Sequence, residues 1–297
     1  VVFLLGCWLA GNPFENTVRI GSDAVIAHGW DQNANGWGII WSVVFLAVVF
    51  EFLDASAGMG YGTAFTPLLI IMGFDPMQIV PVIMIQQACA GLTSSYIHRE
   101  YGNVEWQFRP MSETFKLCLI IAITGSLAVI FSITSVYAIL KLASVWVKLY
   151  VCVLLLGMGV ISVIHLRGTK AYRPKRMLFF GALAGFNKGI GGGGYGPVLT
   201  IGGMMSGVPV KSMIAVTALS EGVVCVVSLL VWLFLLNAGV QLDFILLPSM
   251  MLGSAVAVLA APYAVRVLPE KKWKIIVPIY CCTIAVISFV KLAPSLF

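Results

Sequence analysis

Residues 185–201 read GFNKGIGGGGYGPVLTI, and this stretch decides the fold. The four consecutive glycines at 191–194 would melt an ordinary helix, because each costs about 1 kcal/mol relative to alanine. The apolar run that follows, at 197–205, is short. At about 1.5 Å per residue it reaches only half-way across a bilayer. The pattern predicts a helix that is broken inside the membrane.

A second glycine-broken stretch, EFLDASAGMGYGT, lies at residues 51–63 and precedes another short apolar run at 63–72. A shift of 134 residues aligns seven residues of the two stretches: Phe52, Gly58, Gly60, Tyr61, Gly62, Thr66 and Gly73 fall on Phe186, Gly192, Gly194, Tyr195, Gly196, Thr200 and Gly207. Each stretch is followed by one long apolar run and two more spans. We therefore predict an internal repeat of five elements, a broken pair and three crossings.

The composition requires lipid around these elements. Hydrophobic residues make up 60% of the 297 residues and charged residues only 10%, against roughly 45–50% and about 25% in soluble domains. This excludes a soluble enzyme, a disordered chain and a secreted disulfide scaffold. The net charge of +6 sits in short loops rather than in a basic stripe, so nucleic acid is not an expected partner. The seven cysteines have no metal-binding spacing.

Basic residues predict the orientation of the chain. The loop at 167–176 carries five basic residues and no acid, which places it in the cytoplasm. Tracing outward from it puts the loops at 98–112 and 266–274 on the same side, with at least eleven of the eighteen basic residues. The runs that begin at Pro76 and Val208 then cross in opposite directions. Five elements are an odd number, so the halves are antiparallel, as in the inverted repeats of secondary transporters.

The predicted fold is therefore an all-α, multi-pass protein of the cytoplasmic (inner) membrane. Its predicted parts are an N-terminal segment without an assigned role at 1–36, a first transmembrane repeat at 37–166, a cytoplasmic basic loop at 167–176 and a second repeat at 177–297. The expected partners are the lipid bilayer and a small anionic substrate, with protons as the candidate coupling ion. No cofactor and no metal are expected, and the oligomeric state stays open.

Four charged residues fall inside the apolar elements, at Glu51, Asp54, Lys188 and Glu221. A charge at the centre of a membrane helix costs about 2.5–3.5 kcal/mol, so such residues mark either transport pathways or structural ion pairs. Glu51 and Asp54 are three residues apart and share one helix face. Pairing of Lys188 with a carboxylate would offset part of the cost. Both interpretations stay open, and we take the three acids as the coupling candidates.

The glycine breaks predict an anion site. A helix that starts at the midplane exposes unpaired N–H groups and the positive end of its dipole, and glycine lets a ligand approach the backbone. The alternative is that the glycines only permit close helix packing. Polar residues on the long helices after each break are equally expected to line the site or to join helices. The predicted substrate-binding residues are Gly58, Gly60, Tyr61, Gly62, Gln87, Asn187, Lys188, Gly191, Gly192, Gly193, Gly194, Tyr195, Thr217 and Ser220.

The two glycine stretches resemble those of the sulfite exporter TauE/SafE family of permeases. The likeness extends through residues 66–69 and 72–76 in the first half, through 192–198 and 206–209 in the second, and includes Gly102-Asn103-Val104. It implies export of small anions, such as sulfite, sulfoacetate or other organosulfonates, across the cytoplasmic membrane. One departure is Gln86-Gln87, where the resemblance leads us to expect a serine–glutamate pair. Proton coupling through that position is therefore in doubt, whereas Glu221 remains.

Two rival functions stay open. Three buried acids against one buried lysine also suit a cation or metal-ion permease. An intramembrane enzyme or an assembly factor would need a pair of cysteines or histidines in the bilayer, and no suitable spacing is found. Enzyme signatures such as H-E-x-x-H and G-x-S-x-G are absent from the sequence, so we do not expect an enzyme.

Overall fold

The computed structural model describes residues 39–58, 61–72, 74, 76–136, 173–237 and 244–269, and ten single positions, 150, 153, 156, 157, 160, 272, 279, 283, 286 and 290. The predicted N-terminal segment, residues 167–172 of the basic loop, and most of the predicted spans at 145–166 and 273–292 lie outside them. Within the described residues the chain is helical and has no strand. The all-α prediction is thus confirmed for this part of the chain.

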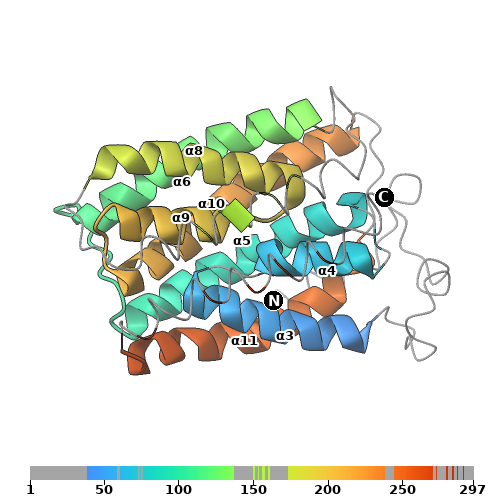
Figure 1. Cartoon of the computed structure of the whole chain (residues 1–297), viewed down its shortest axis with the longest axis horizontal. Coiled ribbons are helices and arrows are strands. Elements are labelled where there is room, and N and C mark those ends of the chain that lie inside the picture. Colours follow the sequence, from blue (N-terminus) through green and yellow to red (C-terminus); the bar gives the residue numbers. More distant parts are fainter. Residues whose placement is uncertain are drawn as a thin grey trace.

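The helices follow the apolar runs of the sequence. Three of them are long and apolar enough to cross a membrane, namely Glu113–Val136, Val210–Leu235 and Leu247–Val267. The elements in chain order are α3 (Trp41–Ala57), the π-helix η1 (Tyr61–Phe65), α4 (Thr66–Ile71), α5 (Pro76–Glu100), α6 (Glu113–Ile133), α8 (Pro174–Gly191), α9 (Tyr195–Met205), α10 (Val210–Asn237) and α11 (Leu247–Val267). Their axes run mostly along the long dimension of the molecule (Figure 1).

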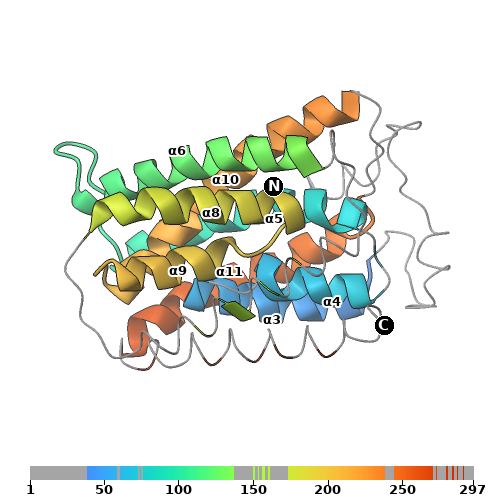
Figure 2. The ribbon, with the colours of Figure 1, turned by 45° about the horizontal axis from the view of Figure 1, so that its top comes forward.

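The two glycine stretches form two helical hairpins that enter the bundle from opposite ends (Figures 1 and 2). The first hairpin, α3 followed by η1 and α4, has its base beside the start of α11, where Ile40 N–H donates to Ser249 Oγ at 2.8 Å. The second hairpin, α8 and α9, is closed at its base by Arg173 N–H donating to the Ser206 carbonyl at 3.0 Å. The tips of both hairpins therefore lie inside the bundle, where η1 contacts α9.

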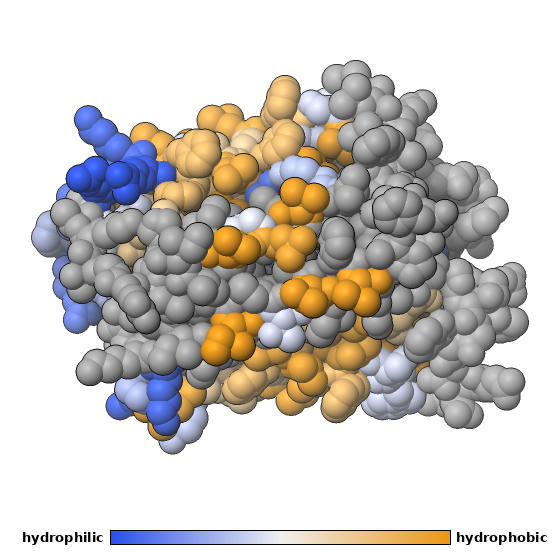
Figure 3. All heavy atoms as spheres, viewed as in Figure 1, coloured by the Kyte–Doolittle hydropathy of each residue, from blue (hydrophilic) through white to orange (hydrophobic). Residues whose placement is uncertain are grey.

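The long helices enclose the hairpins. α10 packs against α5, α6 and α9, whereas α11 packs along α3 and α5, and α6 along α8. Large apolar side chains on the outer faces of these helices are exposed, including Phe45 (68%), Leu127 (66%) and Phe234 (72%). Exposure of that extent on several helices at once marks a surface that meets lipid rather than water. Figure 3 shows this apolar surface across the middle of the molecule.

Basic residues collect at one end of the bundle. The end of α5, the starts of α6, α8 and α10 and the end of α11 all lie there, and Lys211 Nζ donates to the Arg266 carbonyl at 3.0 Å across it. In Figure 3 the most hydrophilic residues gather at this end. We call it the basic end. It brings together the described parts of the three loops that the sequence places in the cytoplasm.

Candidate functional site

The tips of the two hairpins are built alike. α3 ends at Gly58, which has φ 69°, and its N–H donates to the Asp54 carbonyl at 2.8 Å. α8 ends at Gly192, which has φ 70°, and its N–H donates to the Lys188 carbonyl at 2.8 Å. Only glycine adopts this left-handed conformation at little cost. The glycine stretches are therefore helix ends, and each chain returns from its end within a few residues.

The two tips touch backbone to backbone. A Cβ placed on Gly62 would lie 2.0 Å from the Gly192 carbonyl oxygen, and one on Gly193 would lie 2.2 Å from the Gly62 carbonyl oxygen. Thr63 Oγ1 accepts a hydrogen bond from Gly194 N–H at 3.0 Å. Thr200 Oγ1 donates to the Gly58 carbonyl at 2.9 Å. Two threonines thus fasten the crossing in both directions.

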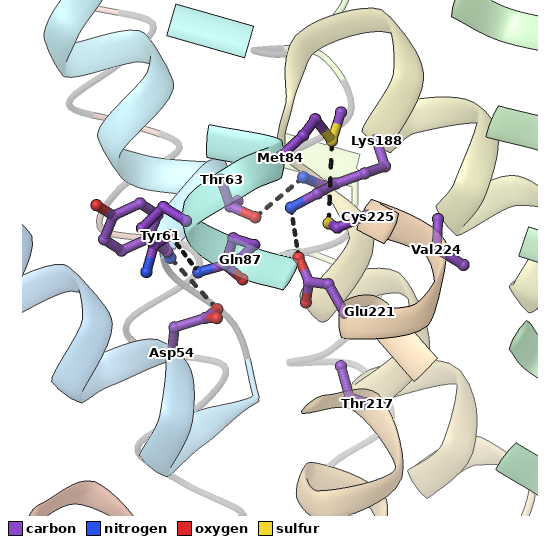
Figure 4. A network of polar contacts seen from close by, with 12 residues as sticks. Asp54, Tyr61, Thr63, Met84, Gln87, Lys188, Thr217, Glu221, Val224 and Cys225 are labelled. Atoms are coloured by element: carbon purple, nitrogen blue, oxygen red, sulfur yellow. Dashed lines mark hydrogen bonds and ion pairs between the residues drawn. The ribbon is translucent and has the colours of Figure 1, made fainter. Parts of the chain in front are cut away.

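A buried ion pair lies beside this crossing. Lys188, in the last turn of α8, is fully buried, and its Nζ lies 2.6 Å from Glu221 Oε1 on α10 (Figure 4). The two side chains expose 0% and 6% of their surface. Cys225, one turn further along α10, places its Sγ 3.9 Å from Met84 Sδ of α5. Lys188 therefore sits between a carboxylate and a sulfur-rich apolar wall.

The other two buried acids come from α3. Glu51 Oε2 accepts hydrogen bonds from Gln86 Nε2 at 2.7 Å and from Gln87 Nε2 at 3.0 Å. Asp54 Oδ1 accepts the backbone N–H of Tyr61 at 3.3 Å. Two amide donors therefore stabilise an ionised Glu51, whereas Asp54 has one long backbone contact.

A narrow cavity joins these groups. It has room for about one water molecule. Glu51, Asp54, Gln87, Thr217 and Glu221 contribute polar groups to it, and Ala55, Gly58, Gly91, Ser94 and Ala218 complete its lining. The described residues hold no group of three or more His, Cys, Asp or Glu side chains that is arranged to bind a metal ion. The cavity lies on the side of the crossing that faces the basic end, because its lining comes from the second half of α5 and the first half of α10.

Comparison with known proteins identifies the family. The model of the sulfite exporter TauE/SafE family matches residues 43–288, which include both hairpins. The chain belongs to the TauE/SafE family. It is 26% identical over 167 residues to the "Probable membrane transporter protein YtnM" of Bacillus subtilis (strain 168). This match covers 52% of the chain and 51% of the relative, so the chain spans about half the length of the curated relative that it matches. No solved structure matches the chain significantly.

The resemblance drawn from the two glycine stretches is thereby confirmed, and with it a multi-pass membrane transporter surrounded by lipid. TauE/SafE is a family of membrane transporters, which agrees with the expectation of a non-enzyme. The family assignment alone names no substrate for this chain. That question returns to the residues around the crossing.

The structure of this TauE/SafE protein brings some predicted site residues together and turns others away. Glu51, Asp54, Gln87, Thr217 and Glu221 line one cavity. Other predicted residues make contacts elsewhere. Ser220 Oγ donates to the Thr217 carbonyl at 3.2 Å, Asn187 Oδ1 accepts from Tyr150 Oη, and the Tyr195 hydroxyl points to Gly125 of α6. Gly60 lies outside the described residues, and Gly191 belongs to α8 rather than to the break.

The backbone N–H groups expected to be free for an anion are partly used by the protein itself. Those of Gly58 and Gly192 cap their own helices, and that of Gly194 is held by Thr63. The reason is that each hairpin tip is buried against the other, and buried N–H groups find partners. An anion held by these groups must displace such an acceptor.

Sequence reasoning missed several residues of the crossing in this family member. Thr63 and Thr200 were not among the predicted site residues, although both flank the glycine runs. Gln86, one of two departures from the expected family pattern, donates the shorter hydrogen bond to Glu51. Ser94 is buried, lines the cavity and has no hydrogen-bond partner among the described residues. Its position two turns beyond Gln87 on α5 was the available signal.

Proposed function

We propose that this TauE/SafE protein carries small anions, such as sulfite or organosulfonates, out across the cytoplasmic membrane by alternating access. The observation that carries the proposal is Lys188, a fully buried cation beside the crossing of the hairpins. A buried charge in a membrane helix is expensive to retain, and so it marks a substrate or ion pathway. A compact oxyanion is the class of ligand that a lysine and helix ends bind best.

The anion competes with Glu221 for Lys188. In the structure Glu221 Oε1 occupies the position that an oxyanion oxygen would take, 2.6 Å from Nζ. Gln87 and Thr217 line the adjoining cavity and offer hydrogen bonds to a ligand there. Because the cavity admits only about one water molecule, anion entry requires the hairpin tips to separate.

Alternating access follows from two inverted halves, at 37–166 and 177–297, joined by the basic loop at 167–176. Three observations support this division. The hairpins enter from opposite ends, their αL caps at Gly58 and Gly192 have φ values of 69° and 70°, and Tyr61 and Tyr195 each begin the returning segment. Rocking one half against the other would open the crossing to either side in turn.

A binding screen on the purified full chain tests the substrate class. Sulfite, sulfoacetate, taurine, sulfate and thiosulfate are added in turn, and the shift in thermal unfolding is measured. A ligand that binds the folded state raises the unfolding temperature by mass action. We expect sulfite or an organosulfonate to stabilise the wild type and to lose its effect in Lys188→Ala.

The matched control is Lys116→Ala, which removes an exposed lysine that pairs with Glu113. It should keep the wild-type response to the anion. Wild-type stabilisation and efflux in a folded Lys188→Ala variant would contradict an anion site at Lys188.

A cation permease remains the second candidate, because three carboxylates and one lysine surround the cavity and its neighbour Lys188. Flux measurements in vesicles containing the purified protein separate the two functions. Movement of sulfite without movement of Ni²⁺ supports the anion carrier, and the opposite result supports the cation permease.

A further inference from the structure

The three acids at the crossing are neutralised to very different degrees. Glu221 has Lys188 at 2.6 Å, and Glu51 has two side-chain amides at 2.7 and 3.0 Å. Asp54 has the backbone N–H of Tyr61 at 3.3 Å. The amide nitrogen of Gln87 has two hydrogens, and its contacts with Glu51 Oε2 and Gln86 Oε1, both at 3.0 Å, use them. Asp54 is the least stabilised carboxylate of the three.

The charge balance requires a further positive partner. With all three acids ionised, the site would carry two uncompensated negative charges beside one lysine. Leaving a buried charge unpaired costs about 3–5 kcal/mol. Glu51 and Asp54 also lie on one face of α3, where like charges repel. A proton on Asp54 removes both penalties and disturbs none of the stronger contacts.

The groups that face Asp54 come from every neighbouring element. They are Glu51 on its own helix, Tyr61 on η1, Gln87 on α5, Lys188 on α8, and Thr217 and Glu221 on α10. His98 of α5 approaches the next residue, where its Nε2 lies 3.0 Å from the Ala55 carbonyl oxygen. α11 packs along α3, and its described charged residue is Arg266 at the basic end. Lys188 is the cation of this set, and Glu221 already holds it.

An independent feature of the same cavity indicates a bound water. Ser94 is 1% exposed, lines the cavity with Asp54, and its Oγ has no hydrogen-bond partner among the described residues. A buried hydroxyl left unpaired costs about 1–3 kcal/mol. The cavity volume suits one water, which would satisfy Ser94 and reach Asp54. Ser94 also lies towards the basic end, since it is in the last two turns of α5.

We propose that Asp54 is the residue that takes up and releases the coupling proton, through the Ser94 water and from the basic end. The step is a simple transfer: an O–H bond forms on the free Asp54 oxygen, and the donor is a hydronium ion that becomes water. The proton is held by the first hairpin and the anion by Lys188 of the second. The inference rests on the proposed anion transport and assigns its coupling ion to one residue.

Transport assays on the full chain in liposomes test this assignment. Exchange of labelled sulfite for unlabelled sulfite is measured at equal pH, and net accumulation is measured under a pH gradient. Asp54→Asn imitates the protonated acid, so it should keep exchange and lose the accumulation driven by the pH gradient. Asp54→Glu should restore that accumulation. Glu113→Gln, which removes an exposed acid far from the site, should behave as the wild type.

The outcomes separate the two proposals. No sulfite exchange by the wild type contradicts the proposed anion carrier itself. Wild-type exchange without any response to the pH gradient leaves the anion carrier intact and overturns the role of Asp54. So does an Asp54→Asn variant that still accumulates sulfite under the gradient, or one that folds and loses exchange as well.

A chemical measurement keeps the proposal testable if Asp54→Asn fails to fold. Dicyclohexylcarbodiimide reacts with protonated carboxyl groups in apolar surroundings, and mass spectrometry locates the modified residue. We expect modification of wild-type Asp54 that decreases as the pH rises. Modification at Glu51 or Glu221 without Asp54, or at none of the three, overturns the assignment.

Discussion

Gly62→Ala tests the contact on which the site depends, the crossing of the two hairpin tips. The added Cβ would lie 2.0 Å from the Gly192 carbonyl oxygen and 2.9 Å from its carbon. Ordinary van der Waals contact begins at 3.4 Å, so the tips must separate by about 1.4 Å. The obstructing atoms are backbone and cannot rotate away. Gly62 has no positive φ, so the effect is steric and not conformational.

Overpacking of this kind costs about 1–3 kcal/mol and sometimes more. Separation by that distance would also stretch the 3.0 Å hydrogen bond from Gly194 N–H to Thr63 Oγ1 beyond hydrogen-bond range. We therefore expect Gly62→Ala to lower the thermal unfolding temperature in detergent and to reduce anion flux.

The matched control is Gly157→Ala. A Cβ at Gly157 would have no heavy atom within 4 Å, and alanine favours a helix over glycine by about 1 kcal/mol. This variant should be as stable as the wild type or slightly more so. A Gly62→Ala protein with wild-type unfolding temperature and flux would show that the tips do not meet as described.

Three further changes test single contacts of the site, each measured as unfolding free energy in detergent. Lys188→Met or Glu221→Met alone should cost about 3–5 kcal/mol, because each leaves one buried charge unpaired, whereas the double variant should recover most of the loss; a double variant as unstable as the singles would contradict the pair. Thr63→Val should cost about 1–3 kcal/mol, since the first N–H of the second return segment loses its acceptor; an unchanged stability would remove that hydrogen bond. Gln86→Leu should cost about 1.5–3 kcal/mol through its bond to ionised Glu51, and a smaller loss would indicate that Glu51 is neutral.

Helix positions and the two breaks could be predicted from the sequence because they depend on local properties. The glycine stretches end α3 and α8 at Gly58 and Gly192, where the αL conformation excludes other residues at little cost. Tyr61 and Tyr195, aligned by the shift of 134 residues, each begin a helical segment. Local spacing fixes such features, whatever the rest of the chain does.

The partners inside the site could not be predicted in the same way. Lys188 pairs with Glu221, 33 residues further along the chain, and not with an acid of α3. Glu51 is satisfied by two glutamines at the position where the family pattern suggested a carboxylate. These pairings depend on how α3, α5 and α10 are rotated about their axes, and helices that are apolar on nearly every face carry little periodic signal of rotation.

The two hairpins are alike in backbone and unlike in charge. The shift of 134 residues that aligns Gly58 with Gly192 also places Asp54 on Lys188 and Glu51 on Gly185. Equal backbones let two inverted halves exchange conformations, as the proposed alternating access requires. Unequal charges mean that the exchange is not neutral: the cavity seen now, on the basic side, is lined by acids, whereas its counterpart on the other side would be lined by Lys188. On the proposed mechanism, the first hairpin therefore offers a proton site to one side of the membrane, and the second offers an anion site to the other. Reversing the charge at one position alone, as in Asp54→Lys, should abolish proton-driven transport even if the protein folds, because both sides would then present a cation.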